Sequence, residues 1–327
     1  MPDVKQQLVR TFLTDASLAY RNRNYIYSMV APILNVPSPR TKITKYNKGS
    51  WFRDEAIVRA PGTETPVSKL TTTSVNLSTR QIAAAYDITD EDIQNSGIEG
   101  GAPTQDLKLE AVEAASDKLD LRNEINLATI VRAANFSGVG AGGEDAAGLW
   151  VPSGSTNTAW LDVVNGINTI VGNTGIKPNR LAVDRRTFEG MRRCDELRDA
   201  VKYSGGYLNE QVMAQAFGLD MVIVSDAIYS TAEETAAQTD FTALNIWETN
   251  ANKGFALLYY VPPAITIRSL STFAHVRAPV MNSSLNRAIF ETRDDLKHLW
   301  HYEAMEECES VVLSTDLAYH WNDTALT

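Results

Sequence analysis

The longest helical pattern in the chain places the strongest constraint on its fold. Pro103 or Thr104 can open a helix that continues to about Ala134, and Gly138 lies beyond its end. About thirty helical residues span about 45 Å. The positions that recur at helical spacing and predict a buried stripe are Leu107, Val112, Leu119, Ile125, Leu127, Ile130 and Val131. The opposite side carries Glu110, Glu113, Asp117, Lys118, Asp120 and Arg122. A helix this long, with one side in solvent, acts as a strut.

The segments before this helix predict an arm and a long hairpin. Apolar residues at helical spacing indicate a helix from Val4 to about Tyr20, and three prolines make residues 21–39 irregular. Strand-like stretches follow at Lys42–Lys48, Asp54–Arg59 and Ser74–Tyr86, with a polar tip that contains Pro61 and Gly62. A hairpin with so few apolar residues has no core of its own, so we expect it to lie against a neighbouring subunit.

After the hairpin, the chain predicts a compact α/β domain and then a return to strands. Thr89 can cap a short helix that Gly97 ends. Helices and strands alternate from Thr158 to Tyr260, which indicates a second domain. The predicted helices are Thr158–Val171, Arg185–Arg193, Asp195–Val201 and Leu208–Phe217, and the predicted strands are Arg180–Val183, Met221–Ser225, Phe241–Glu248 and Gly254–Tyr260. Ser271–Arg277, Ile289–His298 and Tyr302–Leu313 predict the later strands.

Composition excludes several classes of protein. The 327 residues are 44% hydrophobic and 21% charged, which is enough apolar material for a core and suggests about two domains. The formal net charge of −10 argues against a protein that reads or wraps nucleic acid, so we expect any DNA contact to be weak and non-specific. Two cysteines, Cys194 and Cys308, form no disulfide framework and are interpreted as buried thiols in a reducing compartment. The sequence shows no secretory signal and no apolar run long enough for a membrane span, so we expect a soluble protein made in the cytoplasm, without a membrane partner.

Motifs with possible chemistry are weak. Gly138–Gly143 matches the letters of a dinucleotide-binding fingerprint, but it follows a long helix and precedes a loop, so we interpret it as a flexible loop. His298 and His301 lie beside several glutamates, yet residues three apart on a strand face opposite ways. Cys194 has basic neighbours, but its helical spacing favours packing over catalysis. We therefore predict no catalytic, metal-binding or cofactor-binding residues, no cofactor and no enzyme activity.

The charged patches are better candidates for contacts between subunits. The arm and hairpin are basic through Lys42, Lys45, Lys48, Arg53, Arg59 and Lys69. The long helix is acidic through Glu110, Glu113, Asp117 and Asp120. A basic hairpin laid on the acidic helix of the next subunit would be complementary. The alternative is that both are solvated faces that never meet.

Several short sequence segments, in their order and spacing, resemble the major capsid proteins of tailed bacteriophages with the Hong Kong 97-type fold. These short segments are Thr89–Ile93, Lys177–Val183, Phe217–Ser225, Gly254–Tyr259 and Arg287–Glu291. The resemblance covers nearly the whole chain and implies an α+β fold with five segments. These are an N-terminal arm (1–41), an extended hairpin loop (42–88), a peripheral domain with a spine helix at about 103–134 (89–178), an axial domain of mixed α/β structure (179–270) and the return strands of the peripheral domain (271–327).

The resemblance implies a function in assembly. The expected function is a major capsid protein that forms hexamers and pentamers and closes an icosahedral head around double-stranded DNA. It further implies a portal and a possible decoration protein. Some members of the family begin with a scaffolding segment that is later cleaved, so either such a segment has been removed here or a separate scaffolding protein is used, and Met1 at the start of the arm favours the second. The expected location is the virion, with assembly in the cytoplasm of the host bacterium. Lys69 lies near the hairpin tip, but neither partner of the cross-link known in some members of the family can be matched here, so that chemistry is not carried over.

Two alternatives remain open at the level of sequence. The first is the shell protein of a nanocompartment that has the same fold and encloses protein cargo. The second is a soluble enzyme of unknown type, which would require a convergent polar site that the sequence does not reveal.

Overall fold

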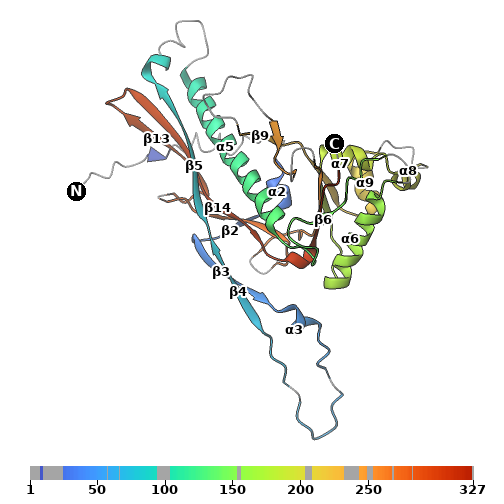
Figure 1. Ribbon diagram of the computed structural model, residues 1–327. Helices are drawn as coiled ribbons and strands as arrows, with labels where there is room; N and C mark the ends of the chain where they lie inside the picture. The colour runs from blue at the N-terminus through green and yellow to red at the C-terminus, as the bar shows by residue number, and fades with distance from the viewer. Residues whose placement is uncertain are drawn as a thin grey trace.

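The computed structural model describes residues 8–9, 25–56, 58–65, 67–93, 104–152, 156–202, 208–231, 243–248, 253–266, 269–281 and 283–325. The body of the molecule has two parts, and a long hairpin projects from one end of it (Figure 1). In one part a long helix lies along a sheet, and in the other several helices pack on a second sheet. The protein is therefore an α+β molecule, as predicted.

The predicted strut is helix α5, Thr104–Ala133, which is 30 residues long. It packs along β14 (Leu299–Val312) and β5 (Arg80–Thr89). Within the described residues its sheet has the order β1–β13–β14–β12–β2, and β5 also pairs with β14. The other strands of this sheet are β1 (Leu8–Val9), β13 (Arg287–Asp294), β12 (Phe273–Ala278) and β2 (Ile33–Asn35). Even-numbered residues of β14 from Tyr302 to Ser310 are buried, as the two-residue period of a strand requires, and α5 covers this part of the sheet.

The second sheet has the order β6–β15–β11–β7–β8. Its strands are β6 (Glu144–Asp145), β15 (Ala318–Asn322), β11 (Phe255–Tyr259), β7 (Arg180–Asp184) and β8 (Met221–Ser225). The helices that accompany it are α6 (Ala159–Thr174), α7 (Arg185–Met191), α8 (Asp195–Val201) and α9 (Glu210–Phe217). Strands β9 (Ile228–Ser230) and β10 (Ala243–Asn245) form a separate two-stranded antiparallel sheet. The α/β alternation that the sequence predicted is confirmed.

Local capping explains where several of these helices begin and end. The Asp184 side chain accepts a hydrogen bond from Thr187 N at the start of α7, and Asn209 accepts one from Val212 N at the start of α9. The Thr89 hydroxyl accepts a hydrogen bond from Asp92 N, so Thr89 caps the helical turn after β5 as expected. Gly97, the predicted end of that helix, lies outside the described residues.

A shared core joins the two parts. It contains helix α2 (Tyr27–Val30), the C-terminal half of α5 and buried residues of both sheets. Phe255 and Tyr259 from the second sheet meet Phe273 from the first, together with Leu127 and Val131 from α5. Strand β15 lies apart from the other strands of residues 271–327, which were predicted as return strands of the peripheral domain. Strand β15 pairs with β11 and β6 in the second sheet.

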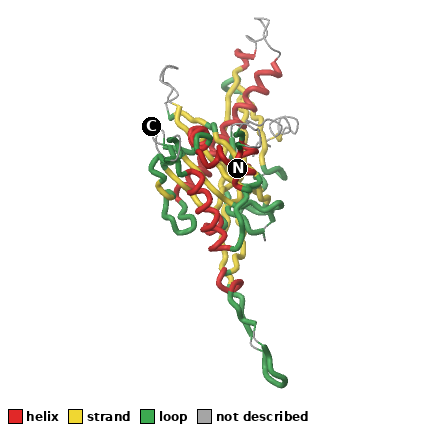
Figure 2. Tube along the Cα trace, turned by 90° about the vertical axis from the view of Figure 1, so that its right-hand side faces the viewer, coloured by secondary structure: helices red, strands yellow, loops and turns green. Residues whose placement is uncertain are grey.

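The hairpin differs from its prediction in two places. Strands β3 (Arg40–Tyr46) and β4 (Thr72–Ser78) pair from Arg40↔Ser78 to Tyr46↔Thr72, and helix α3 (Lys48–Phe52) follows β3. The described residues of 54–59 form no strand, so that prediction was wrong; these residues extend beyond the last strand pair and have no partner strand there. The predicted strand Ser74–Tyr86 is divided at Thr79, because β4 pairs with β3 whereas β5 pairs with β14. Figure 2 shows the resulting loop far from the body.

Three other predictions are corrected. Leu8 and Val9 form a strand with β13, not a helix, because the available sheet edge overrides the helical pattern; the rest of Val4–Tyr20 lies outside the described residues. His298 lies in the turn between β13 and β14 with a φ of 48°, not in a strand. Of the predicted strand Phe241–Glu248, the structure describes residues 243–248, and within these only Ala243–Asn245 is a strand, whereas Trp247 packs into the shared core.

Candidate functional site: assembly surfaces and a buried charge network

The hairpin loop carries large apolar side chains that are mostly exposed. Trp51 is 62% exposed and Phe52 is 68% exposed, and Val58, Val67 and Leu70 are exposed between them and β4. Exposed apolar groups gathered on one projection mark an interaction surface. Among the described side chains of the two hairpin strands, only Ile43 and Leu77 are buried, in a small cluster with β12 and β2. The apolar side chains of the loop are therefore open to solvent within the subunit.

The six basic residues predicted as contacts are all exposed. Lys42 and Lys45 lie on β3, and Lys48 lies on α3, where its Nζ is 3.5 Å from a carboxylate oxygen of Asp316 in its own subunit. The others lie in the loop, and their local contacts are weak: Arg53 Nη1 is 3.8 Å from Glu55 Oε1, and Arg59 Nη1 donates to Thr65 at 3.2 Å. These cations remain exposed enough to meet a partner.

The four acidic residues predicted on the long helix have different positions. Glu110 is exposed, whereas Glu113 and Asp117 are half-buried, and the Tyr25 hydroxyl donates to Asp117 at 3.4 Å. Asp120 is buried and binds Arg287 within its own subunit. Its assignment as a contact residue is corrected, because a carboxylate that pairs in the interior cannot meet a neighbour.

An open pocket of about 510 Å³ lies between β5 and α5. Its acidic residues are Asp87, Asp92 and Glu110, and Leu107 and Ala111 contribute apolar surface. The pocket combines negative charge with an apolar lining, which suits the long apolar stem and charged end of a lysine or arginine.

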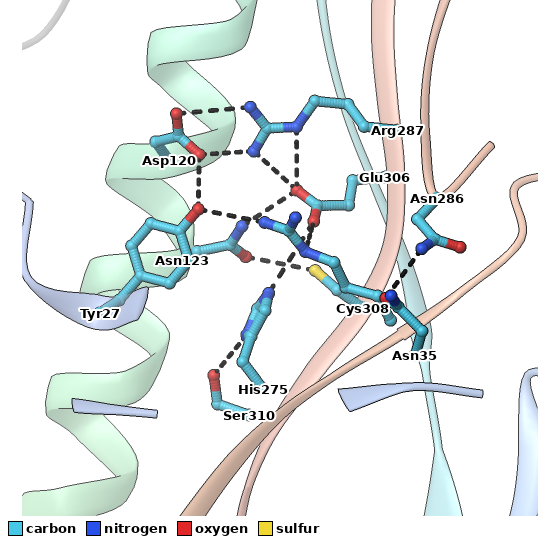
Figure 3. A network of polar contacts seen from close by, with 11 residues as sticks. Tyr27, Asn35, Asp120, Asn123, His275, Asn286, Arg287, Glu306, Cys308 and Ser310 are labelled. Carbon is cyan, nitrogen blue, oxygen red and sulfur yellow. Dashed lines mark hydrogen bonds and ion pairs between the residues drawn. The ribbon is translucent and has the colours of Figure 1, made fainter. Parts of the chain in front are cut away.

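The main polar feature of the interior is a network around Glu306 (Figure 3). One Glu306 oxygen lies 2.5 Å from Arg277 Nε, and the other accepts hydrogen bonds from Arg287 Nη2 at 2.9 Å and Asn123 Nδ2 at 3.1 Å. Arg287 also pairs with Asp120 at 2.5 Å, and the Tyr27 hydroxyl donates to Asp120 at 2.8 Å. The network thus ties α5 to β12, β13, β14 and the start of α2.

The charges in this network stabilise one another. Burial alone would raise the pKa of Glu306, but the neighbouring His275 and the charges of Arg287 and Arg277 hold that pKa below its ordinary value. Burial alone would lower the pKa of Arg287, but the carboxylates of Glu306 and Asp120 raise it. Burial lowers the pKa of His275, which keeps its imidazole neutral, and its Nδ1 lies 3.0 Å from Ser310 Oγ.

His275, Glu306 and Cys308 are close enough to be considered as a metal site, since their ligand atoms lie within 4.8 Å of one another. Arg277 already occupies the Glu306 oxygen that faces His275, at 2.5 Å. Two carboxylates and two guanidinium groups balance the charge of the cluster, so an added divalent cation would be opposed by the arginines. The arrangement fits a structural ion network better than a metal centre.

The other motifs also have structural positions. Gly138–Gly143 forms a loop after α5, with a bridge between Asn135 and Ala141, and it precedes no helix that could hold a pyrophosphate. His301 Nδ1 lies 2.5 Å from Asp87 on the neighbouring strand, and His298 is in the turn. In the described part of the chain, no helix has the length and apolar character needed to cross a membrane.

Comparisons with known proteins agree with this architecture. No protein-family model matches the chain. The major capsid protein of Burkholderia phage BcepMu is 22% identical over 246 residues, which cover 74% of this chain and 76% of that protein. A phage-related protein from Bordetella bronchiseptica RB50 has a TM-score of 0.71 at 17% identity, with 99% of each chain covered.

Two further solved structures extend the comparison. The capsid of the cyanophage P-SCSP1u has a TM-score of 0.57 at 11% identity, covering 98% of this chain and 92% of that one. An encapsulin from Synechococcus elongatus PCC 7942 has a TM-score of 0.50 at 10% identity, with 96% of each chain covered. The chain therefore has the Hong Kong 97-type fold of tailed-phage major capsid proteins, and it resembles one of these proteins in sequence as well.

Proposed function

We propose that this chain is the major capsid protein of a tailed bacteriophage, a structural protein whose function is to assemble with copies of itself. The observation that carries the proposal is the projecting hairpin, whose apolar and basic residues are exposed at 53–71. A subunit that worked alone would gain nothing from such a projection. The match of nearly the whole chain to the capsid fold of a cyanophage, and the sequence likeness to a phage capsid protein, support the same function.

The finer parts of the proposal concern the arrangement of subunits. Hexamers and pentamers would form around the axial domain (179–270), and residues 1–41 and 42–88 would reach neighbours as arm and extended loop. The peripheral domain (89–178) and return strands (271–327) would form the wall, except that β6, α6 and β15 join the axial sheet. Heterologous contacts of this kind close into rings and then into a shell.

The hairpin of one subunit has a complementary surface on the next. Its loop offers Arg59 and Lys69, and the pocket between β5 and α5 offers Asp87, Asp92 and Glu110. Opposite charges on the two surfaces would fix the register of the contact and exclude wrong partners. Lys42, Lys45, Lys48, Arg53, Glu113 and Asp117 would contribute to the same pair of surfaces.

Other partners follow from the same proposal. The shell would assemble in the cytoplasm of a host bacterium with a scaffolding protein and a portal, and a decoration protein could bind its outside. The packaged double-stranded DNA would touch the shell weakly, because the chain carries a net charge of −10.

The shell of a protein-filled nanocompartment is the alternative that the comparisons also support, since an encapsulin has the same fold. The two functions differ in cargo. Nucleic acid in purified particles would support the phage head, and protein cargo with no DNA would support the nanocompartment. The sequence likeness to a phage capsid protein favours the former.

The experiment is to purify the full chain, measure its size by light scattering and image any large species by negative-stain microscopy. We expect closed shells, or rings of five and six subunits, either for the chain alone or after coexpression with a scaffolding protein. A chain that stays monomeric or dimeric under both conditions and in crowding agents would contradict the proposal.

A further inference from the structure

Glu124 is a second buried carboxylate on α5, one helical turn beyond Asp120, and its side chain is completely buried. It accepts hydrogen bonds from the backbone N–H groups of Ile26 at 3.2 Å and Tyr27 at 2.6 Å. It also accepts a hydrogen bond from the indole N–H of Trp247. One side chain therefore holds three donors from two segments that are about 220 residues apart in the sequence.

The two segments belong to different parts of the molecule. Ile26 and Tyr27 begin helix α2, which leads into β2 of the first sheet. Trp247 follows β10 and packs at 5.1 Å between ring centroids on Phe255, which lies in β11 of the second sheet. Glu124 thus lies where the start of the first part, the second part and the long helix meet.

The charge of Glu124 has no cation beside it to balance it among its described hydrogen-bond partners, which are all neutral N–H groups. This differs from the Glu306 network, in which arginines balance both carboxylates. A buried carboxylate held only by N–H donors depends on each donor, because a lost hydrogen bond is costly to a charged group in the low dielectric of the interior. Removing one donor raises the free energy of the state in which both segments contact Glu124. Separation of the other segment from Glu124 would let water reach the carboxylate.

We propose that Glu124 is a clasp that couples two contacts of the long helix. One is the packing of residues 25–30 on α5, and the other is the packing of Trp247 and, through Trp247, of the second sheet. If either segment separates from Glu124, the hydrogen bonds between Glu124 and the other segment become weaker. The clasp makes the root of the N-terminal arm and the α/β part of the subunit move as linked units. This coupling does not depend on the proposed capsid function.

The test is hydrogen–deuterium exchange on the full chain with Trp247→Phe, which removes the indole donor and keeps an aromatic ring. We expect the backbone amides of Ile26 and Tyr27 to exchange roughly tenfold faster or more, the effect expected for a hydrogen bond to a charged group. Trp150→Phe is the matched control, because the buried Trp150 donates its indole N–H to Asp162 at 2.7 Å in the other core. Exchange at Ile26 and Tyr27 should be unchanged in this control.

The result that would overturn the clasp is faster exchange at 243–248 in Trp247→Phe with Ile26 and Tyr27 unchanged. An equal increase in strand β14 would also contradict it, since the effect would then be global. Glu124→Gln gives a second reading: both segments should exchange faster than β14. An increase at only one of them would mean that Glu124 does not hold the other segment, which would contradict the clasp.

Discussion

Glu306 has more buried ionic contacts than a single carboxylate usually makes. It lies at 0% exposure, and two arginines, Arg277 and Arg287, share its oxygens. Buried ion pairs add little net stability compared with apolar packing, but breaking one leaves an unpaired charge in the interior. The network therefore acts mainly to fix which faces of α5 and β14 meet.

Glu306→Gln should lower the free energy of unfolding by about 3–5 kcal/mol, because it leaves Arg277 without a charged partner and removes one of the two carboxylates that Arg287 binds. Denaturation of the unassembled subunit in urea would measure the loss. Glu303→Gln is the matched control on the same strand, where the side chain is only half-buried; it should change stability by less than about 0.5 kcal/mol. Equal effects of the two variants would contradict a role for the network.

The pH dependence of stability offers a test at Glu124. Burial raises the pKa of Glu124 to about 7, against hydrogen bonds from Trp247, Ile26 and Tyr27 that lower it. The folded protein therefore binds this proton more tightly than the unfolded chain. The stabilising contribution is complete below a pH of about 4.5 and is lost as the pH rises through about 7.

Between pH 4.5 and pH 8, we expect the free energy of unfolding of the wild type to fall relative to that of Glu124→Gln by up to roughly 3 kcal/mol. The charged and titratable groups around Glu124 are Asp120 on α5 and Tyr25 and Tyr27 on the segment packed against it. Urea unfolding at several pH values would measure the difference. Glu110→Gln, on the exposed part of α5, should keep the wild-type dependence; a parallel pair of curves for Glu124→Gln would contradict the expectation.

The sequence alone could not place these residues. Asp120 and Glu124 follow the helical period of surface charges, and only the arrival of Arg287 and Tyr27 from distant segments makes them interior residues. Glu306 was more accessible to prediction. It shares the two-residue period of Tyr302, Ala304 and Cys308, all buried, so a charged residue on that face was a signal for a buried partner.

At the scale of elements, the loop after α5 depends on one close approach. Gly143 has a φ of +86°, and a Cβ there would lie 2.5 Å from His320 Nδ1 and 2.7 Å from the His320 carbonyl oxygen. His320 is fully buried on β15, and burial lowers its pKa to about 4, so its imidazole stays neutral. The loop can cover β15 only because this position has no side chain.

Gly143→Ala should therefore lower the midpoint of thermal unfolding more than Gly138→Ala does. Gly138 has a similar φ of +82°, but a Cβ there would meet no described atom within 4 Å. Both variants bear the cost of the left-handed conformation, about 1–2 kcal/mol, and only Gly143→Ala adds overpacking of roughly 1–3 kcal/mol. Calorimetry of the two variants would measure the difference, and equal midpoints would refute the close approach.

The hairpin tip gives a second prediction at this scale. Deleting Ala60–Thr71 should leave the subunit folded, because the described residues of this stretch are exposed and the β3–β4 pairing runs no further than Thr72. Shell formation should be impaired. Circular dichroism and electron microscopy would check the two parts; loss of the folded subunit, or normal shells, would contradict the prediction.

Elements with strong local patterns were predictable, and elements chosen by tertiary pairing were not. The 30-residue helix α5 and the alternating strands and helices of the second sheet have clear periodicity and caps, so their limits came within a few residues. Strand β15 and helix α2 are short, and each is stabilised by contacts with elements distant in the sequence: β15 pairs with β11, and α2 packs in the shared core. The failure at Leu8–Val9 has the same cause, since a sheet edge decided a segment whose own pattern was helical.

At the scale of the whole molecule, the body and the hairpin divide the tasks of stability and association. Among the described residues, five clusters of buried residues stabilise the body and the base of the hairpin, whereas the loop at 53–71 contributes to none of them. The same division explains what the sequence could say about assembly surfaces. The exposed charges of the hairpin could be identified from the sequence because the segment has few apolar residues. The pocket that would receive them could not be identified, because its lining comes from two separate elements, β5 and α5, that meet only in the folded chain.

Reversing the charges of the hairpin should separate assembly from folding. Arg59→Glu with Lys69→Glu should reduce shell formation, while the free energy of unfolding changes by less than about 0.5 kcal/mol per residue, since both side chains are exposed. Arg59→Lys with Lys69→Arg keeps the charge and should assemble normally. Light scattering at low and high salt would test this, because screening should weaken assembly of the wild type. Unchanged assembly of the charge-reversed chain would exclude these two cations from the contact.

The position of β15 also determines the order in which the chain can fold. Strands β7, β8 and β11 leave the ribosome well before residues 318–322, because β12, β13 and β14 are synthesised in between. Until β15 arrives, one edge of β11 stays unpaired, and all five residues of β11 are ones that the finished protein buries. A nascent chain at this stage carries an open apolar strand edge, the kind of surface that aggregates or recruits chaperones. The α/β part is therefore not an independent folding unit during translation. Its sheet can be completed by β15 only after the strands of the other part have been synthesised.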